Sequence, residues 1–493
     1  MSIILSIDLG TSSMKTTLFT ADGKIISQAD AGYTTMYPAE NRAEQRPNDW
    51  WSTLLTCLAK LPERERKKVV TLGLSGHMMA GFGINTSKGA EGAWAVGAAL
   101  IHADTRASKE TEEFVNTIGA QRIYSITGHR PSPAYSGPKL AWLRKHEPEQ
   151  YRKSDYFLNP KDYLNFCLTG EIATDYSDAS GTLMFDLTKQ RWNGELGEAL
   201  GIDPEKLPPV LPSSEIIGKV SRWAAGLTGL PESAVVVAGA GDGICAGVGA
   251  ASVEPGAAYN YIGTTSWIAT TSRAPVADPH MRVVTFAHAV PGLYHPLGVM
   301  QTAGAAVEWF CRKFLPHVDG DPSEEFDRLA SASAAGSRGL MFLPYLLGER
   351  SPWWNTECRA AWLGLSQEHG LADMARALLE GVNHNLALIA EIVREYAPFQ
   401  ELSLLGGGGL SAHWPQMLCN SYAVPLFIHK DTVSITARGA AVIAGVGAGL
   451  YRDFTVAKNF VAVLRRLTPE PEEQKRMRAR REEFAAAYKK LYS

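Results

Sequence analysis

The sequence predicts an α/β chain of two similar domains, with one functional site in the cleft between them. Apolar strand-like segments alternate with helical segments, which is typical of layered α/β domains. The segment 257–271 (AAYNYIGTTSWIATT) also echoes 4–19 (ILSIDLGTSSMKTTLF), each reading as a strand, a Gly-Thr turn and a second strand. The two copies lie about half the chain length apart, so we favour a duplicated domain over chance similarity.

Hydrophobic periodicity and turn residues define the elements of the first half. In order, we expect a buried strand over 3–8, a tight turn over 9–13, a returning strand over 14–23, a third strand over 25–33, a helix over 47–61 capped by Asn48, and a strand over 69–76.

The chain is expected to divide near 240–255 into an N-terminal domain of residues 1–250 and a C-terminal domain of residues 251–493. At this point an apolar strand enters a Gly-rich turn and a helix of small residues. The second half then predicts a long amphipathic helix over 371–396, a strand from 401 that enters a Gly run, and a charged, solvated surface helix from Pro469.

The composition excludes several classes of protein. The 493 residues carry 48 Lys and Arg against 51 Asp and Glu, a net charge of −3, which argues against nucleic-acid binding. Six dispersed cysteines show no CxxC pair and predict reduced thiols of a cytoplasmic protein. The N-terminal segment predicts a strand rather than a signal peptide, and the apolar stretches are too short to cross a membrane.

One motif places a carboxylate at a strand end, before a turn of small hydroxylic residues. Consecutive N–H groups in such a turn form an anion-binding concavity, to which Thr11, Ser12 and Ser13 can add hydroxyl donors and Lys15 a charge. Asp8 stands where a magnesium-bound water could be held. The alternative is a plain hairpin, and no GxxxxGK[ST] motif accompanies the turn.

Three further turns follow apolar strands. Asp242 lies in the turn Gly239–Gly243, at a strand end of the kind where α/β folds place their chemistry, although an ordinary helix cap is the alternative. The turn Gly263–Thr265 is the second copy of the first motif. The run Gly406–Gly409 bares a stretch of backbone on which adenine or phosphate can lie, the alternative being a flexible loop.

Together these parts fit phosphoryl transfer, with nests for phosphates, one carboxylate for a metal and another for base catalysis. Neither a GxSxG nor an HExxH motif occurs in the sequence, which disfavours serine and zinc hydrolases.

Several segments resemble the signatures of the FGGY carbohydrate kinases. Residues 136–143 resemble the first signature, residues 360–365 and 373–380 the second, and Gly348-Glu349-Arg350-Ser351-Pro352 a Gly-Glu-Arg segment of the family. Leu378 is the one departure, because a smaller or β-branched residue is usual there. The resemblance covers nearly the whole chain. It implies two ribonuclease-H-like domains of the actin-like ATPase superfamily around a cleft, with ATP, Mg²⁺ and often a homodimer.

The resemblance also implies roles for individual residues. Asp242 would be the base that takes the proton from a sugar hydroxyl, and Asp8 would position the metal. The expected nucleotide contacts are Thr11, Ser12, Ser13, Lys15, Gly263, Thr264, Gly304, Gly408 and Gly409.

The expected sugar contacts are His77, Met78, Met79, Asp104, Arg106 and Asp242. Segment 102–106 (HADTR) is similar to the W-N-D-x-R of xylulokinases, whereas 77–80 (HMMA) departs from their Q-M-H-G. A ketopentose such as xylulose leads, followed by other ketoses, polyols and aldonates. In a regular strand, at most one of the two methionines faces the sugar.

Three tryptophans and a polar pair complete the expectations. Trp353 and Trp354 are expected to form a packing lid, with sugar stacking as the alternative, and Trp267 to fill the second-domain core. Glu44-Gln45 is expected near the pocket. The rivals to a kinase are a non-catalytic actin-like ATPase or sugar sensor, which would not need Asp242, and a nucleotide hydrolase without a sugar acceptor.

Overall fold

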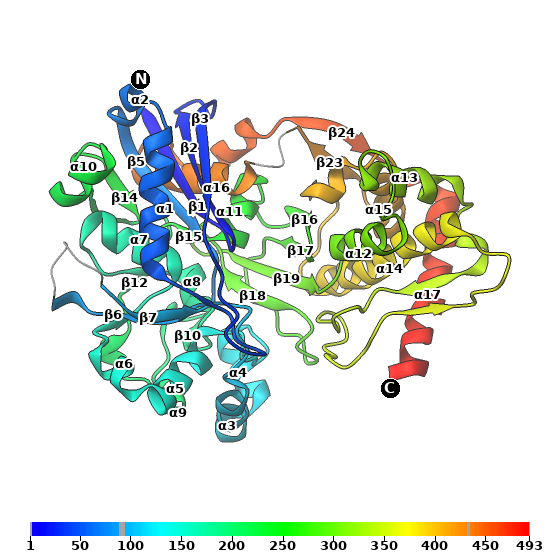
Figure 1. Ribbon diagram of the computed structural model, residues 1–493, viewed down its shortest axis with the longest axis horizontal. Coiled ribbons are helices and arrows are strands. Elements are labelled where there is room, and N and C mark those ends of the chain that lie inside the picture. Colours follow the sequence, from blue (N-terminus) through cyan, green and yellow to red (C-terminus); the bar gives the residue numbers. More distant parts are fainter. Residues whose placement is uncertain (1, 88–93, 431–433, 493) are drawn as a thin grey trace.

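The computed structural model describes residues 2–87, 94–430 and 434–492 and contains two mixed β-sheets (Figure 1). The first sheet has the order β13-β14-β5-β1-β2-β3, with the short strand β15 paired to the end of β5. Its strands are β1 (Ile3–Leu9), β2 (Ser13–Thr20), β3 (Ile25–Gly32), β5 (Val69–Gly76), β13 (Ile216–Lys219), β14 (Val235–Val237) and β15 (Ala240–Gly241).

The second sheet has the order β18-β19-β17-β16-β22-β23-β24. Its strands are β16 (Ala258–Ile262), β17 (Ser266–Thr270), β18 (Val284–Ala287), β19 (Tyr294–Met300), β22 (Leu402–Leu405), β23 (Leu426–His429) and β24 (Val463–Leu467).

The two sheets repeat one topology. In the first, β1 pairs antiparallel with β2 and parallel with β5, and β5 pairs parallel with β14. In the second, β16 has the same relations to β17 and β22, and β22 to β23. The hairpins β1–β2 and β16–β17 are the two similar segments of the sequence. The predicted α/β fold of two ribonuclease-H-like domains is confirmed.

Helices cover both sheets. Those of the first half are α1 (Pro47–Lys60), α2 (Glu63–Arg66), α3 (Ser108–Ile118), α4 (Ala120–Thr127), α5 (Ser136–His146), α6 (Pro148–Lys153), α7 (Pro160–Thr169), α8 (Tyr176–Ser180), α9 (Gly194–Leu200), α10 (Arg222–Thr228) and α11 (Asp242–Gly249). Those of the second half are α12 (Gly304–Phe314), α13 (Pro322–Ala332), α14 (Leu371–Tyr396), α15 (Trp414–Tyr422), α16 (Ile435–Gly447) and α17 (Pro471–Tyr492).

Short strands and 3₁₀ turns connect these elements. A small sheet of order β4-β7-β6-β8 consists of β4 (Glu44–Gln45), β7 (Ala95–Leu100), β6 (Gly81–Ile84) and β8 (Tyr156–Phe157). Two-stranded pairs are formed by β9 (Thr174–Asp175) with β12 (Val210–Leu211), β10 (Phe185–Asp186) with β11 (Arg191–Trp192), and β20 (Met341–Leu343) with β21 (Ala361–Leu363). The 3₁₀ segments are η2 (Pro204–Lys206), η3 (Ser337–Gly339), η4 (Gly407–Leu410) and η5 (Phe454–Phe460).

Helices α11 and α16 join the two sheets. In Figure 1 the orange helix α16, from the second half of the chain, lies against the blue strands β1 and β5 of the first sheet. Glycines allow α11 and α16 to cross closely, because a Cβ on Gly439 would lie 1.8 Å from the Cys245 carbonyl oxygen. A Cβ on Gly249 would lie 1.9 Å from the Ile435 carbonyl oxygen. The two halves are therefore packed together along their helices.

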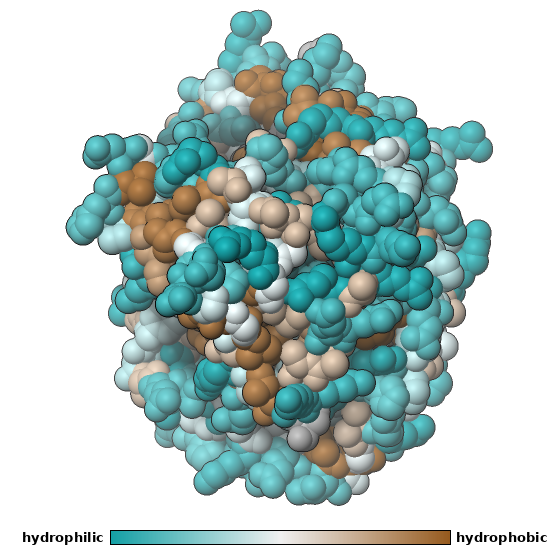
Figure 2. All heavy atoms as spheres, turned by 90° about the vertical axis from the view of Figure 1, so that its right-hand side faces the viewer, coloured by the Kyte–Doolittle hydropathy of each residue, from teal (hydrophilic) through white to brown (hydrophobic). Residues whose placement is uncertain are grey.

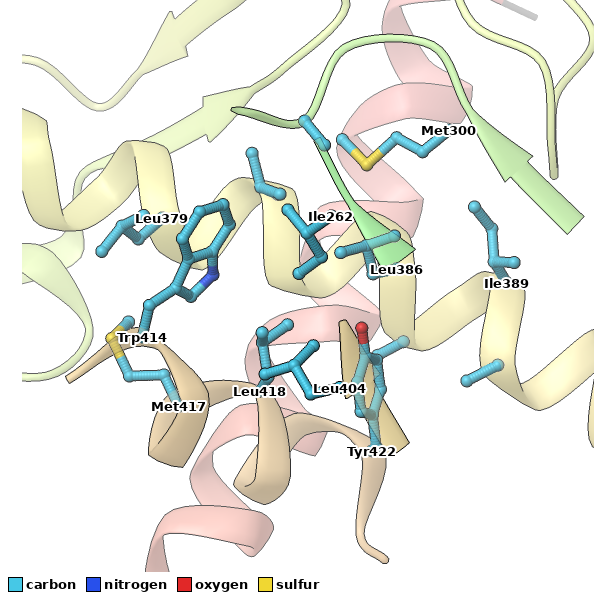
Figure 3. Packing of buried hydrophobic residues seen from close by; sticks show 14 of the residues in the cluster. Ile262, Met300, Leu379, Leu386, Ile389, Leu404, Trp414, Met417, Leu418 and Tyr422 are labelled. Atoms are coloured by element: carbon cyan, nitrogen blue, oxygen red, sulfur yellow. The ribbon is translucent and has the colours of Figure 1, made fainter. Parts of the chain in front are cut away.

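The core of the second half explains why α14 is long and amphipathic. Leu379, Leu386 and Ile389 on α14 are buried against apolar residues of the sheet and of α15 (Figure 3). Ile262, at the end of β16, is part of the same core. Burial of each such side chain stabilises the fold by roughly 1.5–3 kcal/mol. The sheet end that carries the Gly263 turn is thus firmly supported.

Two predictions about helices need correction. Asn48 does not cap α1; the helix begins at Pro47, whose fixed φ suits the first helical position, and the Asn48 Oδ1 atom accepts a 2.6 Å bond from Tyr163. Helix α17 is not solvated all round. The face of the molecule in Figure 2 is largely hydrophilic, with several apolar patches. Most of α17 is exposed or half-buried, but Met477, Phe484 and Tyr488 are buried on one helical stripe. Arg481 interrupts this apolar stripe in the sequence.

The six cysteines are buried free thiols, as the sequence predicts. Within the described ranges, no helix has both the length and the apolar character needed to cross a membrane.

Candidate functional site

The first predicted turn connects β1 to β2 and is held by its carbonyl oxygens. Gly10 N–H donates to the Ser13 oxygen at 3.0 Å, Gln45 Nε2 donates to the Thr11 oxygen at 2.7 Å, and Tyr33 Oη donates to the Gly10 oxygen. Because these side chains bond carbonyls, they leave the hydroxyl groups of the turn unused. Ser12 is exposed to solvent. Gln45 therefore supports the turn from behind, a role that its position in the sequence did not reveal.

Asp8 lies near the end of β1, directly opposite Lys15 on β2. Burial raises the pKa of Asp8, while the neighbouring Ser75 and Lys15 lower it. Lys15 is exposed, and its positive charge partly offsets the negative charge of the Asp8 carboxylate. Both predicted residues thus belong to the same strand pair at the base of the turn.

The second turn, Gly263–Thr265, lies under the start of α12. Ala303 N–H and Ala305 N–H each donate to the Thr264 oxygen at 3.1 Å, and Gly304 N–H donates to the Gly263 oxygen at 2.9 Å. A Cβ on Gly304 would lie only 2.4 Å from that same oxygen. In this structure Gly304 lets the helix approach the turn, which accounts for the glycine without a ligand.

Close packing also explains part of the glycine run Gly406–Gly409. Gly406 has a φ of +81° and, like Gly408, lies so close to Ile262 that a Cβ would meet it at 2.4 and 2.7 Å respectively. A Cβ on Gly407 would meet nothing within 4 Å, and one on Gly409 would make only ordinary contacts. Packing on β16 thus requires two of the four glycines, and the stretch leaves bare backbone beside the second turn.

Asp242 is the first residue of α11, immediately after the two-residue strand β15. Its Oδ1 atom accepts a 2.7 Å bond from Gly243 N–H. Burial and, as a smaller cause, the charge of Asp8 together raise the pKa of Asp242 to about 7. A carboxyl group of this pKa can gain and lose a proton near neutral pH, which is the property that a general base needs.

Asp242 opens into a cavity of about 430 Å³ between the two halves of the chain. The first half contributes Thr11, His77, Met78, Met79, His102, Tyr135, Asp242, Gly243 and Ile244; the second contributes Tyr261, Gly263, Thr264, Thr265, Trp267, Val284, Phe286, His295, Leu297, Val299, Arg350 and Trp354. A larger cavity of about 680 Å³ lies against β23 and residues 250–258, and none of the predicted site residues lines it. The expected interdomain site is the one beside Asp242.

Two histidines provide polar groups in this cavity. Burial lowers the pKa of His77 to about 3 and that of His102 to about 4, so both rings are neutral at pH 7. Among the described residues, neither ring nitrogen of His77 finds a hydrogen-bond partner, although the residue is only 1% exposed. A neutral imidazole offers one donor and one acceptor, which suits a sugar hydroxyl.

Both methionines line the cavity, although strand alternation predicted at most one. The reason is that β5 ends at Gly76, so residues 77–80 are not part of a strand and alternation does not apply. Met79 has a φ of +63°, which turns the chain sharply. Met78 fits because Gly241 has no side chain; a Cβ there would lie 2.2 Å from the Met78 sulfur.

Asp104 and Arg106, the other predicted sugar contacts, do not line the cavity. Arg106 Nη2 donates to Asp104 Oδ2 at 2.7 Å and to Glu44 Oε1 at 2.6 Å. Asp104 Oδ2 also accepts a 2.7 Å bond from Ala43 N–H. The charges of Asp104 and Arg106 therefore compensate each other. Glu44, which was expected near the pocket, belongs to the same network. Arg106 also lies 4.9 Å from the centre of the Trp142 ring.

Arg350 is a cavity residue to which no sequence pattern assigned a role. Burial lowers its pKa, and its Nε atom has no hydrogen-bond partner within the described part of the chain. The neighbouring Glu349 is buried and fixes the backbone instead, accepting bonds from Gln301 N–H at 2.6 Å and Arg350 N–H at 2.8 Å. The Gly-Glu-Arg segment thus combines a structural carboxylate with an arginine in the cavity wall.

Aromatic residues complete the wall and differ from expectation. Trp267 stacks on Tyr261 with ring centres 4.3 Å apart and lines the cavity, so it does not simply fill the core. Trp354 also lines the cavity, whereas Trp353 stacks on Tyr488 of α17. Tyr135 is a further lining residue that carries no sequence signal beyond its place before the first signature. The sequence did not reveal these positions in the cavity wall, because exposure to the cavity depends on contacts between the two halves of the chain.

The topology and the site define a two-domain α/β protein of the actin-like ATPase type, with paired Gly-Thr turns and a carboxylate at a shared cavity. Models of the FGGY family of carbohydrate kinases match the chain over residues 3–249 for the N-terminal domain and 258–448 for the C-terminal domain. The chain belongs to this family and is an ATP-dependent carbohydrate kinase.

Similar proteins cover almost all of the chain. The xylulose kinase of Bacillus subtilis strain 168 is 30% identical over 458 residues, which are 92% of this chain and 89% of that protein. The structure of ligand-bound xylulose kinase from Lactobacillus acidophilus aligns with a TM-score of 0.93 and 26% identity, over 100% of this chain and 99% of that one. A gluconate kinase from Lactobacillus acidophilus aligns equally well, with a TM-score of 0.93, 26% identity, and 99% and 98% coverage.

Proposed function

We propose that this enzyme phosphorylates a ketopentose, with xylulose as the first candidate. The similarity to xylulose kinases over most of the chain supports this substrate. The observation that carries the mechanism is Asp242, a carboxyl group whose pKa is raised to about 7 at a cavity with unpartnered histidine nitrogens.

In the proposed reaction, a sugar hydroxyl attacks the γ-phosphorus of ATP, the bond to the β,γ-bridging oxygen breaks, and ADP leaves. Asp242 accepts the hydroxyl proton as the new O–P bond forms. The neutral rings of His77 and His102 orient the sugar by hydrogen bonds, and Met78 and Met79 fill the space around its carbon chain. The cavity walls from both halves exclude water, which would otherwise compete as the acceptor.

The nucleotide would lie between the two Gly-Thr turns. Thr11, Ser12, Ser13 and Thr264 offer hydroxyl groups for its phosphates, and Lys15 offers charge. The adenosine end would lie against the glycine run at Gly408 and Gly409, where the exposed backbone of Gly407 gives access. Gly263 closes the second turn through its 2.9 Å bond to the Thr265 oxygen.

The residues at the base of the cleft also fit Mg²⁺. Asp8 is a half-buried carboxylate whose charge raises the pKa of Asp242, so a cation beside it would relieve an unfavourable pair of charges. Magnesium is usually bound through one or two carboxylates together with phosphate oxygens. When bound, the ion would neutralise charge on the phosphates. Asp8 would hold it, directly or through water.

Arg350 supports a second candidate substrate, an aldonate such as gluconate. A buried guanidinium without a partner at Nε is suited to a carboxylate, and a gluconate kinase is among the similar structures. We also propose that the enzyme is cytoplasmic, in line with its six free thiols; fractionation of the producing cell should place it in the cytosolic fraction.

The test is ADP release from purified enzyme with xylulose, ribulose, gluconate, glycerol and no acceptor. The proposal expects xylulose to give the highest kcat/KM. Gluconate giving the highest value would instead establish the second candidate, and turnover independent of any acceptor would contradict a sugar kinase. The Arg350→Lys variant separates the two candidates further, because loss of bidentate geometry should affect gluconate more than xylulose.

A further inference from the structure

A fully buried charge cluster lies behind the turn Gly239–Gly243, which contains Asp242. Lys161 Nζ lies 2.5 Å from Asp162 Oδ1, 3.0 Å from Asp175 Oδ1 and 3.1 Å from Asp178 Oδ2. All four side chains are 0% exposed. Three carboxyl groups thus share one ammonium group in the interior, and burial raises the pKa of Asp162 and Asp178. Such clusters are weak contributors to stability, because desolvation offsets much of the attraction.

One arm of this cluster leads directly to Asp242. Ser177 Oγ donates to Asp175 Oδ2 at 2.6 Å and accepts a 3.0 Å bond from Gly241 N–H. Gly241 immediately precedes Asp242 and is fully buried within β15. The chain of contacts therefore runs from Lys161 through Asp175 and Ser177 to the last amide before the proposed base. In the described part of the chain, the serine oxygen is the side-chain acceptor of that amide.

Neighbouring contacts fix the same stretch of backbone. Asn165 Nδ2, on the helix that carries Lys161, donates to the Ala238 oxygen at 2.9 Å. Gly239 N–H donates to the Ser213 oxygen at 2.9 Å, and Ser213 Oγ donates to Asp175 Oδ2 at 2.7 Å. Helix α7 also lies against the end of β5, because a Cβ on Gly76 would be 3.0 Å from Lys161 Cβ. The cluster thus supports residues 238–241 from one side.

We propose that Ser177, held by the buried Lys161–Asp175 pair, is a positioning residue that sets the backbone at Gly241 and thereby aims the Asp242 carboxylate at the sugar hydroxyl. This inference rests on the proposed role of Asp242 as the base. Ser177 does not line the cavity, so it acts only through the backbone. Small displacements of a reacting group are known to reduce rates strongly, because the near-attack geometry is lost.

The chain offers a matched control for this idea. Ser177 and Ser213 both donate to Asp175 Oδ2, at 2.6 and 2.7 Å, and both are buried at 0% and 1% exposure. The side chain of Ser177 alone continues to the Gly241 amide. Ser177→Ala and Ser213→Ala should therefore lower the thermal stability to a similar extent, whereas only Ser177→Ala should change catalysis.

The experiment measures kcat and KM for both variants, with the best sugar found for the wild type. For Ser177→Ala we expect kcat to fall about tenfold, with the KM values for sugar and ATP changed less than about twofold. For Ser213→Ala both parameters should stay near wild type. An unchanged kcat in folded Ser177→Ala, or an equal loss in both variants, would overturn the positioning role.

A second pair of variants covers the case in which Ser177→Ala does not fold. Ser177→Thr and Ser177→Val have nearly the same shape, but only threonine keeps the oxygen that the Gly241 amide needs. The threonine variant should retain several times the kcat of the valine variant; equal kcat values would contradict the proposal. Failure of the proposed substrate is distinguishable, because it would appear as the wrong sugar preference in the wild-type enzyme.

Discussion

Asp242 is the residue at which function and stability oppose each other. Its pKa is raised to about 7 by burial and by Asp8, so the folded protein binds this proton more tightly than the unfolded chain does. Between about pH 4 and pH 7 the folded state holds more protons, and stability therefore decreases as the pH rises through this range. Above about pH 7 the buried charge is fully present and destabilises the fold.

The variant Asp242→Asn tests both consequences. We expect sugar-dependent kcat to fall about 10²- to 10⁴-fold, which is the usual contribution of a general base. At pH 8 the variant should melt at a temperature equal to or above that of the wild type, because the unfavourable charge is gone, and this advantage should shrink towards pH 5. Melting curves and ADP release at both pH values check this. A clear loss of stability at pH 8 would show that the carboxylate is a structural group.

The pH profile of the wild type follows from the same group. The value of kcat/KM should decline as the pH falls below about 7, because protonated Asp242 cannot accept the hydroxyl proton. The histidines should add no step above pH 5, since their pKa values are lowered to about 3 and about 4. A profile that is flat from pH 5.5 to pH 8, measured with saturating ATP, would contradict this assignment.

His77 is a buried polar group whose ring nitrogens have no hydrogen-bond partner among the residues that the structure describes. We expect His77→Leu to raise the sugar KM about tenfold, equivalent to ~1.4 kcal/mol, because the ring bonds the substrate. His384→Leu is the matched control: His384 is also buried, with a pKa lowered to about 3, but lies on α14 away from the cavity. It should alter the melting temperature and leave the KM unchanged. Equal KM effects would indicate that His77 acts only through packing.

At the scale of elements, the crossing of α11 and α16 links the two sheets. Helix α11 begins with Asp242, and α16 packs against β1, the strand that carries Asp8. The crossing therefore connects the two carboxylates of the cleft through one close helix–helix contact. Its geometry depends on the absence of side chains at Gly249 and Gly439.

Gly439→Ala should consequently destabilise the protein, since its Cβ would lie 1.8 Å from the Cys245 carbonyl oxygen and force the helices apart. We expect a loss of about 1–3 kcal/mol in the free energy of unfolding, measured by denaturant titration. Gly226→Ala on α10 is the control, because a Cβ there meets nothing within 4 Å and alanine favours a helix. If both alanines were tolerated equally, the close crossing would not limit stability.

At the scale of the whole molecule, the cavity wall comes from both halves of the chain. We expect a sugar bound there to contact the first half through His77 and the second through Arg350, and thereby to stabilise both together. Helices α11 and α16, which pack between the two sheets, also couple the stability of the two halves. The protein should behave as one cooperative unit.

Calorimetry tests this expectation. At a sugar concentration 100 times Kd, stability should rise by about 2.7 kcal/mol in a single transition that includes both domains. Two resolved transitions, only one of which moves with sugar, would contradict the coupling. Sedimentation of the same samples establishes whether the chain forms the homodimer expected from the family resemblance.

The sequence by itself determined the elements and the principal motif positions. The two hairpins, the long helix α14 and the carboxylate at Asp242 follow from local periodicity and turn residues, which act over a few residues. The recurrence of the Gly-Thr turn also indicated two similar domains, because a repeated local pattern can be recognised without knowing its contacts.

Only the tertiary structure decided how these parts work together. It paired Asp104 with Arg106 away from the cavity, brought Arg350 and Tyr135 into its wall, and used Gly406 and Gly408 for packing on Ile262. It also raised the pKa of Asp242 by placing it among buried groups beside Asp8. The physical reason is common to all of these: burial, pairing and cavity exposure depend on residues distant in the chain, whose proximity no local pattern encodes.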